Sequence, residues 1–198
     1  MSTHTKSFHD QAHTIKKNAE EVIESLKINE ILKQYGTLFF TGSYALDLMT
    51  WNDIDMQLVI KEGVNTKKAF NEIFSHFFQN KAFIKSKVIH FHGDFKPVMP
   101  RGLYLGLEFS LQELGGMWKL DLWVLEQEDF DKNRTFIKDI ESILTPKIRG
   151  LILEMKHEMM SGNSRVPQLG SYELYKALLK GYRSKDEINK YLKSKNVR

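Results

Sequence analysis

Two runs of alternating apolar and polar residues, separated by a pair of glycines, constrain the fold of this chain more than any other feature. In residues 101–111, the apolar set consists of Leu103, Leu105, Leu107 and Phe109. In residues 117–125, the apolar set consists of Leu120, Leu122 and Val124. A period of two is typical of a strand with one buried face, and Gly115-Gly116 between the runs predicts a turn. We therefore expect a β-hairpin with one face in the core.

The rest of the chain combines helical and strand periodicities. Apolar residues three and four positions apart predict a helix over residues 7–34 and another over residues 66–79. Short strand patterns occupy residues 37–41, 54–60 and 81–91. Further helical patterns occupy residues 129–143, 146–160, 171–180 and 184–195. This order predicts an α/β (α+β) protein, with a mixed β-sheet, packed helices and a C-terminal helical part.

The same order predicts three units along the chain. They are an N-terminal helical segment (1–35), a core that carries the sheet (36–145) and a C-terminal helical part (146–198). No cysteine is present, which excludes a disulfide scaffold, a zinc ribbon, an iron–sulfur protein and a thiol nucleophile. No apolar run approaches the ~18–20 residues of a membrane span, and residues 1–17 lack the apolar stretch of a secretory signal. We expect a cytoplasmic protein with no membrane partner.

The net charge of +4 is confined to the C-terminal segment. Residues 181–198 contain six basic and two acidic side chains, so the remainder of the chain carries no net charge. Nucleic-acid binding across the whole surface is therefore not indicated. The basic C-terminal helix is the one place where a nucleic acid could bind, although a solvated helix face is the simpler interpretation.

The segment that carries chemistry joins Gly42-Ser43 to an Asp-x-Asp pattern at Asp53 and Asp55. A glycine after a strand allows a sharp turn and a close approach by a ligand. The Ser43 hydroxyl and the backbone N–H groups at a helix start suit the oxygens of a triphosphate. Asp53 and Asp55 are two positions apart on a strand, so both carboxylates project from one face. The segment therefore predicts an anion site beside a pair of carboxylates.

A pair of close carboxylates is costly unless a positive charge lies between them. Mg²⁺ prefers oxygen ligands together with phosphate, and a third carboxylate would complete a site for two metal ions. Asp121 is the best candidate, because it lies in the middle of a strand between Leu120 and Leu122. We therefore predict a metal site made of Asp53, Asp55 and Asp121.

These residues resemble the nucleotidyltransferase superfamily of DNA polymerase beta. Its small bacterial members, the aminoglycoside and minimal nucleotidyltransferases, are the nearest in style, and the resemblance covers roughly residues 36–125. By resemblance, Gly42 and Ser43 would hold the β- and γ-phosphates. Asp53 and Asp55 would bind two Mg²⁺ ions, and Asp121 would bind the catalytic one and help to activate the acceptor hydroxyl.

The resemblance implies a Mg²⁺-dependent enzyme that moves a nucleoside monophosphate from a nucleoside triphosphate to a hydroxyl, with release of pyrophosphate. ATP is the nucleotide we expect, and the acceptor would be a small molecule, such as an antibiotic, or a protein. Two other interpretations stay open. The fold could be retained by an inactive module that binds a nucleotide or a partner, or the chain could be an antitoxin-type minimal nucleotidyltransferase.

One departure from the family concerns the residues that follow Gly-Ser. They are mainly apolar here, where many relatives carry arginine or polar residues, so the triphosphate lacks an obvious cation. Lys119 and Arg101 are the candidates that the sequence offers. Glu108 shares a strand face with Tyr104 and is a candidate general base for the acceptor hydroxyl, or else an exposed strand glutamate.

Overall fold

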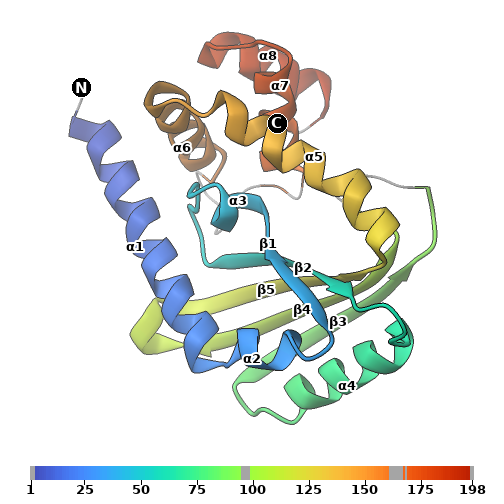
Figure 1. Ribbon diagram of the computed structural model, residues 1–198. Helices are drawn as coiled ribbons and strands as arrows, with labels where there is room; N and C mark the ends of the chain where they lie inside the picture. Colours follow the sequence, from blue (N-terminus) through green and yellow to red (C-terminus); the bar gives the residue numbers. More distant parts are fainter. Residues whose placement is uncertain (1–2, 95–98, 161–166, 168, 197–198) are drawn as a thin grey trace.

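The computed structural model describes residues 3–94, 99–160, 167 and 169–196, and within them five strands form one sheet (Figure 1). The strands are β1 (Gly36–Phe40), β2 (Asp53–Ile60), β3 (Phe83–Phe91), β4 (Gly102–Leu111) and β5 (Gly116–Leu125). Their order across the sheet is β1-β2-β5-β4-β3. β2 and β5 are parallel, whereas the other neighbouring pairs are antiparallel. The mixed sheet expected from the sequence is confirmed.

β4 and β5 form the expected hairpin and pair along their whole length. The connection is longer than a Gly-Gly turn, because the 3₁₀ helix η1 (Gln112–Leu114) precedes the glycines. Gly115 and Gly116 have φ angles of 94° and 87°, in the left-handed region that glycine adopts without a Cβ clash. The glycines therefore reverse the chain after one additional helical turn.

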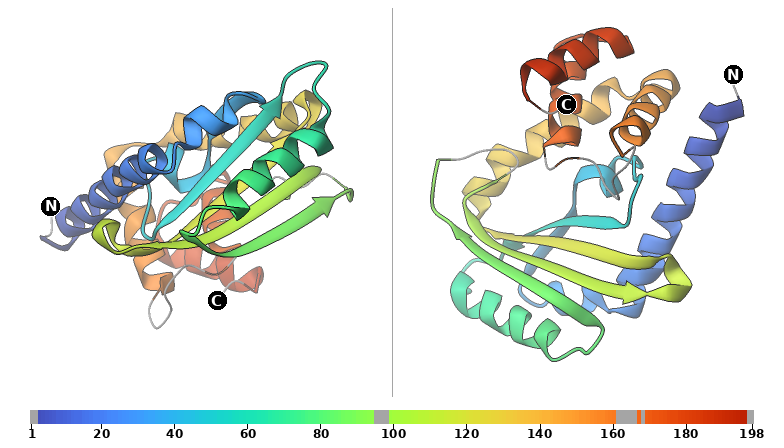
Figure 2. Two further views of the ribbon diagram at one scale, coloured as in Figure 1. Left: turned by 90° about the horizontal axis from the view of Figure 1, so that it is seen from below. Right: turned by 180° about the vertical axis from the view of Figure 1, so that it is seen from behind.

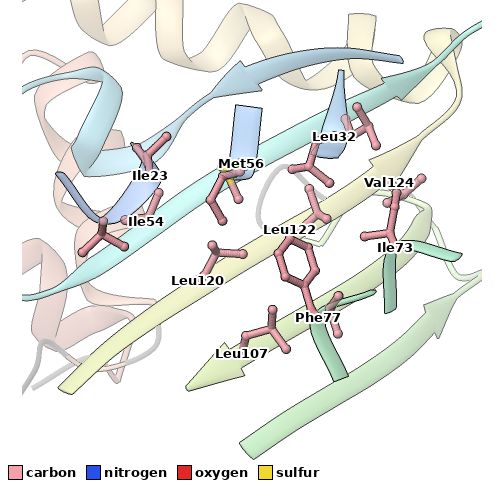
Figure 3. Packing of buried hydrophobic residues seen from close by; sticks show 14 of the residues in the cluster. Ile23, Leu32, Ile54, Met56, Ile73, Phe77, Leu107, Leu120, Leu122 and Val124 are labelled. Carbon is pink, nitrogen blue, oxygen red and sulfur yellow. The ribbon is translucent and has the colours of Figure 1, made fainter. Parts of the chain in front are cut away.

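The apolar face of the sheet is covered by α1 (Thr3–Ser25), α2 (Ile28–Leu32) and α4 (Thr66–Phe78). Figure 2 shows α1 and α4 on one side of the sheet and the C-terminal helices on the other. Met56 of β2 and Leu122 of β5 lie in one buried cluster with Phe77 of α4 (Figure 3). Because side chains alternate along a strand, the odd-numbered residues of β2 and β5 face away from this core.

The helix expected over residues 7–34 is divided in the structure into α1 and α2. The chain turns at Lys27, whose φ of 53° and ψ of 33° are left-handed. No glycine or proline marks this position in the sequence, so the apolar periodicity alone did not reveal the break. The turn lets Ile28 and Leu32 reach the core, where both are fully buried.

The other side of the sheet carries one short helix from the middle of the chain, α3 (Gly42–Ala45), and the helices that follow β5. These are α5 (Gln127–Ile143), α6 (Pro146–Met160), α7 (Gly170–Leu179) and α8 (Lys185–Ser194). A second buried cluster joins α6, α7 and α8 to Leu46 and Leu48, which lie between α3 and β2. The C-terminal helices therefore pack on the turn that follows Gly42-Ser43 (Figure 1). Among the described residues, no helix combines the length and the apolar character needed to cross a membrane.

Candidate functional site

Asp53, Asp55 and Asp121 lie together on the face of the sheet that is turned away from the α1, α2 and α4 core. Asp55 of β2 is directly opposite Asp121 of the parallel strand β5. One carboxylate oxygen from each of the three residues lies within 4.8 Å of the others. We call these residues the carboxylate cluster. Hard oxygen ligands at this spacing fit Mg²⁺, so the cluster could hold a metal ion.

The carboxylate cluster concentrates negative charge in a partly buried position. Burial raises the pKa of Asp55 well above its usual value, and the charges of Asp53 and Asp121 raise this pKa further. Lys119 and Lys156 act in the opposite direction, because each places a positive charge near Asp55. Neighbouring carboxylates remain ionised together only when positive charge is close. A bound cation would supply that charge.

Gly42 brings the chain between β1 and β2 directly against the carboxylate cluster. We call residues 41–50, which include α3, the Gly-Ser turn. Gly42 has a φ of +59°, and a Cβ at this position would lie 2.2 Å from Oδ2 of Asp55. The Thr41 N–H donates to the backbone carbonyl of Asp55 at 2.9 Å. Only glycine therefore allows the Gly-Ser turn to lie this close to the carboxylates.

A buried lysine from α6 reaches the Gly-Ser turn. The Lys156 ammonium donates to Oγ of Ser43 at 2.8 Å and to the carbonyl of Leu48 at 2.6 Å. It also lies 4.5 Å from the centre of the Trp51 ring. Burial lowers the pKa of Lys156 to about 7, although Asp55 and Asp53 counteract the shift. Lys156 is therefore a cation beside Ser43 that the sequence did not identify.

Two further side chains from the C-terminal helices hold the Gly-Ser turn. The Arg149 guanidinium of α6 donates to the carbonyls of Leu46 and Asp47, at 2.6 and 3.0 Å. The hydroxyls of Tyr175 and Ser43 are 3.4 Å apart, and burial raises the pKa of Tyr175 to about 12. The turn is therefore positioned by residues far along the chain.

Sequence reasoning missed these residues for an identifiable reason. Lys156 follows Ile152 by four positions and precedes Met159 by three, so it lies on the apolar face of its helix. A cation on such a face was the available signal, since lysine is rarely fully buried without partners. Arg149 precedes Ile152 by three positions and carries the same signal. Nothing in the local pattern identifies the Gly-Ser turn as the partner of these cations or of Tyr175.

Lys119 and Tyr104 contact the third carboxylate. The Lys119 ammonium forms an ion pair with Oδ2 of Asp121 and lies 3.9 Å from Oδ2 of Asp53. The Tyr104 hydroxyl donates to Oδ1 of Asp121 at 2.6 Å. The structure therefore places Lys119, one of the two cations proposed from the sequence, beside the carboxylate cluster and not at the Gly-Ser turn.

The other candidates from the sequence lie outside the carboxylate cluster. The Arg101 guanidinium pairs with Asp129 at 2.9 Å and with Glu128 at 3.6 Å, at the start of α5. Glu108 is opposite Lys119 in the β4–β5 register and pairs with Lys85 at 2.8 Å. Glu108 thus lies on the same face of the sheet as the carboxylate cluster but is not one of its members.

Comparison with known proteins identifies the fold. No protein-family model matches the sequence, and no curated protein matches it. The solved structure of the poly(A) polymerase complex GLD-2–GLD-3 matches with a TM-score of 0.55 and 15% identity, over 93% of this chain and 61% of that chain. The Cid1 poly(U) polymerase with MgGTP matches with a TM-score of 0.52 and 14% identity, over 80% of this chain and 48% of that chain. Its complex with Mg 3′-dATP matches with a TM-score of 0.53 and 12% identity, over 87% of this chain and 54% of that chain.

The chain therefore shares the fold of these polymerases, a mixed sheet with packed helices. It spans less than two thirds of each polymerase chain that it matches. At such low identity the likeness concerns the fold. The chemistry of this chain has to be argued from its own residues.

Proposed function

We propose that this protein is a nucleotidyltransferase that moves a nucleoside monophosphate from a Mg²⁺–nucleoside triphosphate to a hydroxyl and releases pyrophosphate. The observation that carries the proposal is the direct contact between two parts of the site. A cluster of three carboxylates within 4.8 Å lies against a Gly-Ser turn to which the buried Lys156 of α6 donates a hydrogen bond. The shared fold with polymerases crystallised with MgGTP and Mg 3′-dATP supports the same reading.

The carboxylate cluster is the metal-binding part of the proposed site. Asp53 and Asp55 would bind two Mg²⁺ ions, and Asp121 would bind the catalytic one. When bound, Mg²⁺ neutralises charge on the triphosphate and lowers the pKa of an oxygen that it contacts. Asp121 would help to activate the acceptor hydroxyl, whose oxygen attacks the α-phosphorus while the bond to the leaving pyrophosphate breaks. The raised pKa of Asp55 supports metal binding by the cluster, because the cluster gains stability from added positive charge.

The Gly-Ser turn is the phosphate-binding part. The backbone at Gly42 and the hydroxyl of Ser43 would bind the β- and γ-phosphates. The Lys156 ammonium, already 2.8 Å from the Ser43 oxygen, would supply positive charge toward the leaving pyrophosphate. This lysine takes the place of the cation that many members of the superfamily carry beside Gly-Ser.

The acceptor that we propose is a hydroxyl on a small molecule, antibiotics included, or on a protein. Outside residues 181–198 the chain has no net charge, which does not favour a long polyanionic acceptor. We propose ATP as the nucleotide to test first.

Calorimetric titration tests the nucleotide site. ATP, GTP, CTP and UTP would each be titrated with and without Mg²⁺ into wild type, Asp53→Asn/Asp55→Asn and the control Asp139→Asn, whose carboxylate is exposed on α5. We expect Mg²⁺-dependent binding in wild type and in the control, and none in the double variant. Failure of the folded wild type to bind any triphosphate would favour the inactive, partner-binding interpretation.

Transfer of label then tests the acceptor class. The nucleotide that binds would be supplied with an α-³²P label, together with small hydroxyl compounds, cell protein or RNA in separate reactions. Label on a small molecule or on protein agrees with the proposal. Label on RNA alone would leave the reaction type intact and overturn the proposed acceptor.

A further inference from the structure

Lys119 occupies a special position beside the carboxylate cluster. It precedes Asp121 by two residues on β5, so both side chains project from the same face of the sheet. Its ammonium is paired with Oδ2 of Asp121 and lies 3.9 Å from Oδ2 of Asp53. Its side chain is only 27% exposed. A positive charge of the chain itself therefore contacts two of the three carboxylates that would hold a metal ion.

The second oxygen of Asp121 is also bonded within the protein. The Tyr104 hydroxyl donates to Oδ1 at 2.6 Å, from the neighbouring strand β4. Gly106, opposite Asp121 in the register, leaves room for this hydroxyl, because a Cβ there would lie 2.4 Å from the Tyr104 oxygen. Both oxygens of Asp121 therefore have donors from this chain, and only one of these donors carries a charge.

A second acceptor for the Lys119 ammonium lies one strand away. Glu108 of β4 is directly opposite Lys119 of β5 and shares its face of the sheet. Directly opposed side chains on an antiparallel pair have Cβ atoms about 4.5–5.5 Å apart, within reach of a lysine. Glu108 also pairs with Lys85 at 2.8 Å. Lys119 thus lies between two sets of carboxylates, the cluster on one side and Glu108 on the other.

We propose that Lys119 is a built-in counter-ion of the carboxylate cluster, and that it moves from Asp53 and Asp121 to Glu108 when a divalent cation binds. The proposal rests on the proposed function only in taking the cluster as the metal site. The physical reason is that a lysine ammonium and a divalent cation repel each other strongly when they share the same carboxylate oxygens in a partly buried site. The balance between Lys119 and Glu108 then sets how tightly the metal is held, before any nucleotide binds.

Binding of Mn²⁺ alone tests this exchange. Free Mn²⁺ would be followed by electron paramagnetic resonance during titration of wild type, Lys119→Met and Glu108→Gln, without nucleotide or acceptor. We expect Lys119→Met to bind Mn²⁺ about tenfold more tightly or better, because the competing charge is gone. We expect Glu108→Gln to bind it about threefold more weakly or worse, since Lys119 loses its alternative partner.

Two control variants make the result specific. Lys87→Met removes an exposed positive charge from the same sheet face, on β3 opposite Gly106, and should change the Mn²⁺ affinity less than about twofold. Asp53→Asn/Asp55→Asn should lose the site. Thermal unfolding with and without Mn²⁺ verifies folding, and Lys119→Met should gain more stability from the ion than wild type does.

The proposal is overturned if folded Lys119→Met binds Mn²⁺ no more tightly than wild type, or if Lys87→Met gains as much. It is also overturned if wild type and Asp53→Asn/Asp55→Asn bind Mn²⁺ equally. Should Lys119→Met not fold, Lys119→Arg and Glu108→Gln decide, because tighter binding by either contradicts the exchange. Wild type that binds Mn²⁺ and transfers nucleotide, with no effect of Lys119→Met, would remove this inference and keep the proposed function. If Lys119→Met and Glu108→Gln shift the Mn²⁺ affinity as expected but wild type transfers no nucleotide, this inference stands and the proposed function is lost.

Discussion

The carboxylate cluster and the Gly-Ser turn meet at one point, yet they are held in place by different means. The cluster is fixed by backbone pairing, since Asp55 and Asp121 are directly opposite on parallel strands. The turn is held mainly by side chains of packed helices. Arg149 and Lys156 of α6 donate to its backbone carbonyls and to Ser43, and Lys16 of α1 donates to the carbonyl of Tyr44 at 2.9 Å. One part of the site therefore depends on the sheet, whereas the other depends largely on how the helices pack.

This difference shows how a single site can have two independent supports. A substitution in α6 should weaken the phosphate part without weakening the metal part, because no cluster carboxylate lies on that helix and Lys156 contributes only a positive charge near Asp55. A substitution in the cluster should do the opposite. Gly42 links the two parts, because its missing Cβ lets the turn lie against Asp55.

The largest effect is expected from Asp55→Asn. The change removes the central carboxylate, so metal-dependent nucleotide transfer should fall by roughly 10³-fold or more, which corresponds to several kcal/mol of charge stabilisation. The fold should be retained, since burial and two like charges already raise the pKa of Asp55. Steady-state kinetics and thermal unfolding, compared with Asp139→Asn, would measure both. Substantial remaining activity would contradict the metal role.

Lys156→Met should give the next largest effect, and it should be selective. Triphosphate affinity should fall about 10- to 100-fold, since a hydrogen bond to a charged group contributes about 1.5–3 kcal/mol. Mn²⁺ binding to the carboxylate cluster should not weaken, because loss of a positive charge near Asp55 favours a cation there. The control Lys147→Met removes an exposed lysine from the same helix. Equal losses of metal and triphosphate binding would erase the distinction between the two parts.

The pH dependence of triphosphate binding should separate the two parts of the site further. Because burial lowers the pKa of Lys156 to about 7, its ammonium loses its proton as the pH rises through that value. Triphosphate affinity should therefore decrease above pH 7, by at most about tenfold per pH unit. Calorimetric titrations across this range would measure the change, and Lys156→Met should not show it.

The effect on folding has the opposite sign. The unfolded chain keeps the Lys156 proton up to its ordinary pKa of 10.5, whereas the folded protein releases it near 7. Between these values the unfolded state binds more protons, so this lysine makes the protein more stable as the pH rises. Denaturant unfolding at several pH values should show that slope in wild type and a smaller one in Lys156→Met. Identical slopes would contradict the lowered pKa.

Arg149→Met should give the smallest of these effects on nucleotide binding. The change removes the donors to Leu46 and Asp47, and Asp47 has a left-handed φ of 56°. We expect a loss of stability of about 1–3 kcal/mol and a fall in triphosphate affinity of only a few fold. Denaturant unfolding and calorimetry would test this. An unchanged stability would show that the Arg149 hydrogen bonds do not stabilise the Gly-Ser turn.

Local sequence patterns predict the hairpin of β4 and β5, the strand that carries Asp53 and Asp55, and a Gly42-Ser43 turn shortly before that strand. These features depend on a period of two and on short spacings, which local sequence encodes directly. The shared face of Asp53 and Asp55 also follows from strand geometry alone. Asp121 could be proposed as the third carboxylate because it lies in the middle of an apolar strand, but the register that pairs it with Asp55 could not.

The meeting of distant groups in the site follows from the packing of the whole chain. The parallel register brings Asp121 to Asp55, and the packing of α6 brings Lys156 to Ser43. The packing also brings Lys119 to the carboxylate cluster and Arg101 to Asp129. The sequence positions of the two cations did not determine these partners. The physical reason is that periodicity specifies which face a residue occupies, whereas the partner on that face is chosen by the packing of the whole chain.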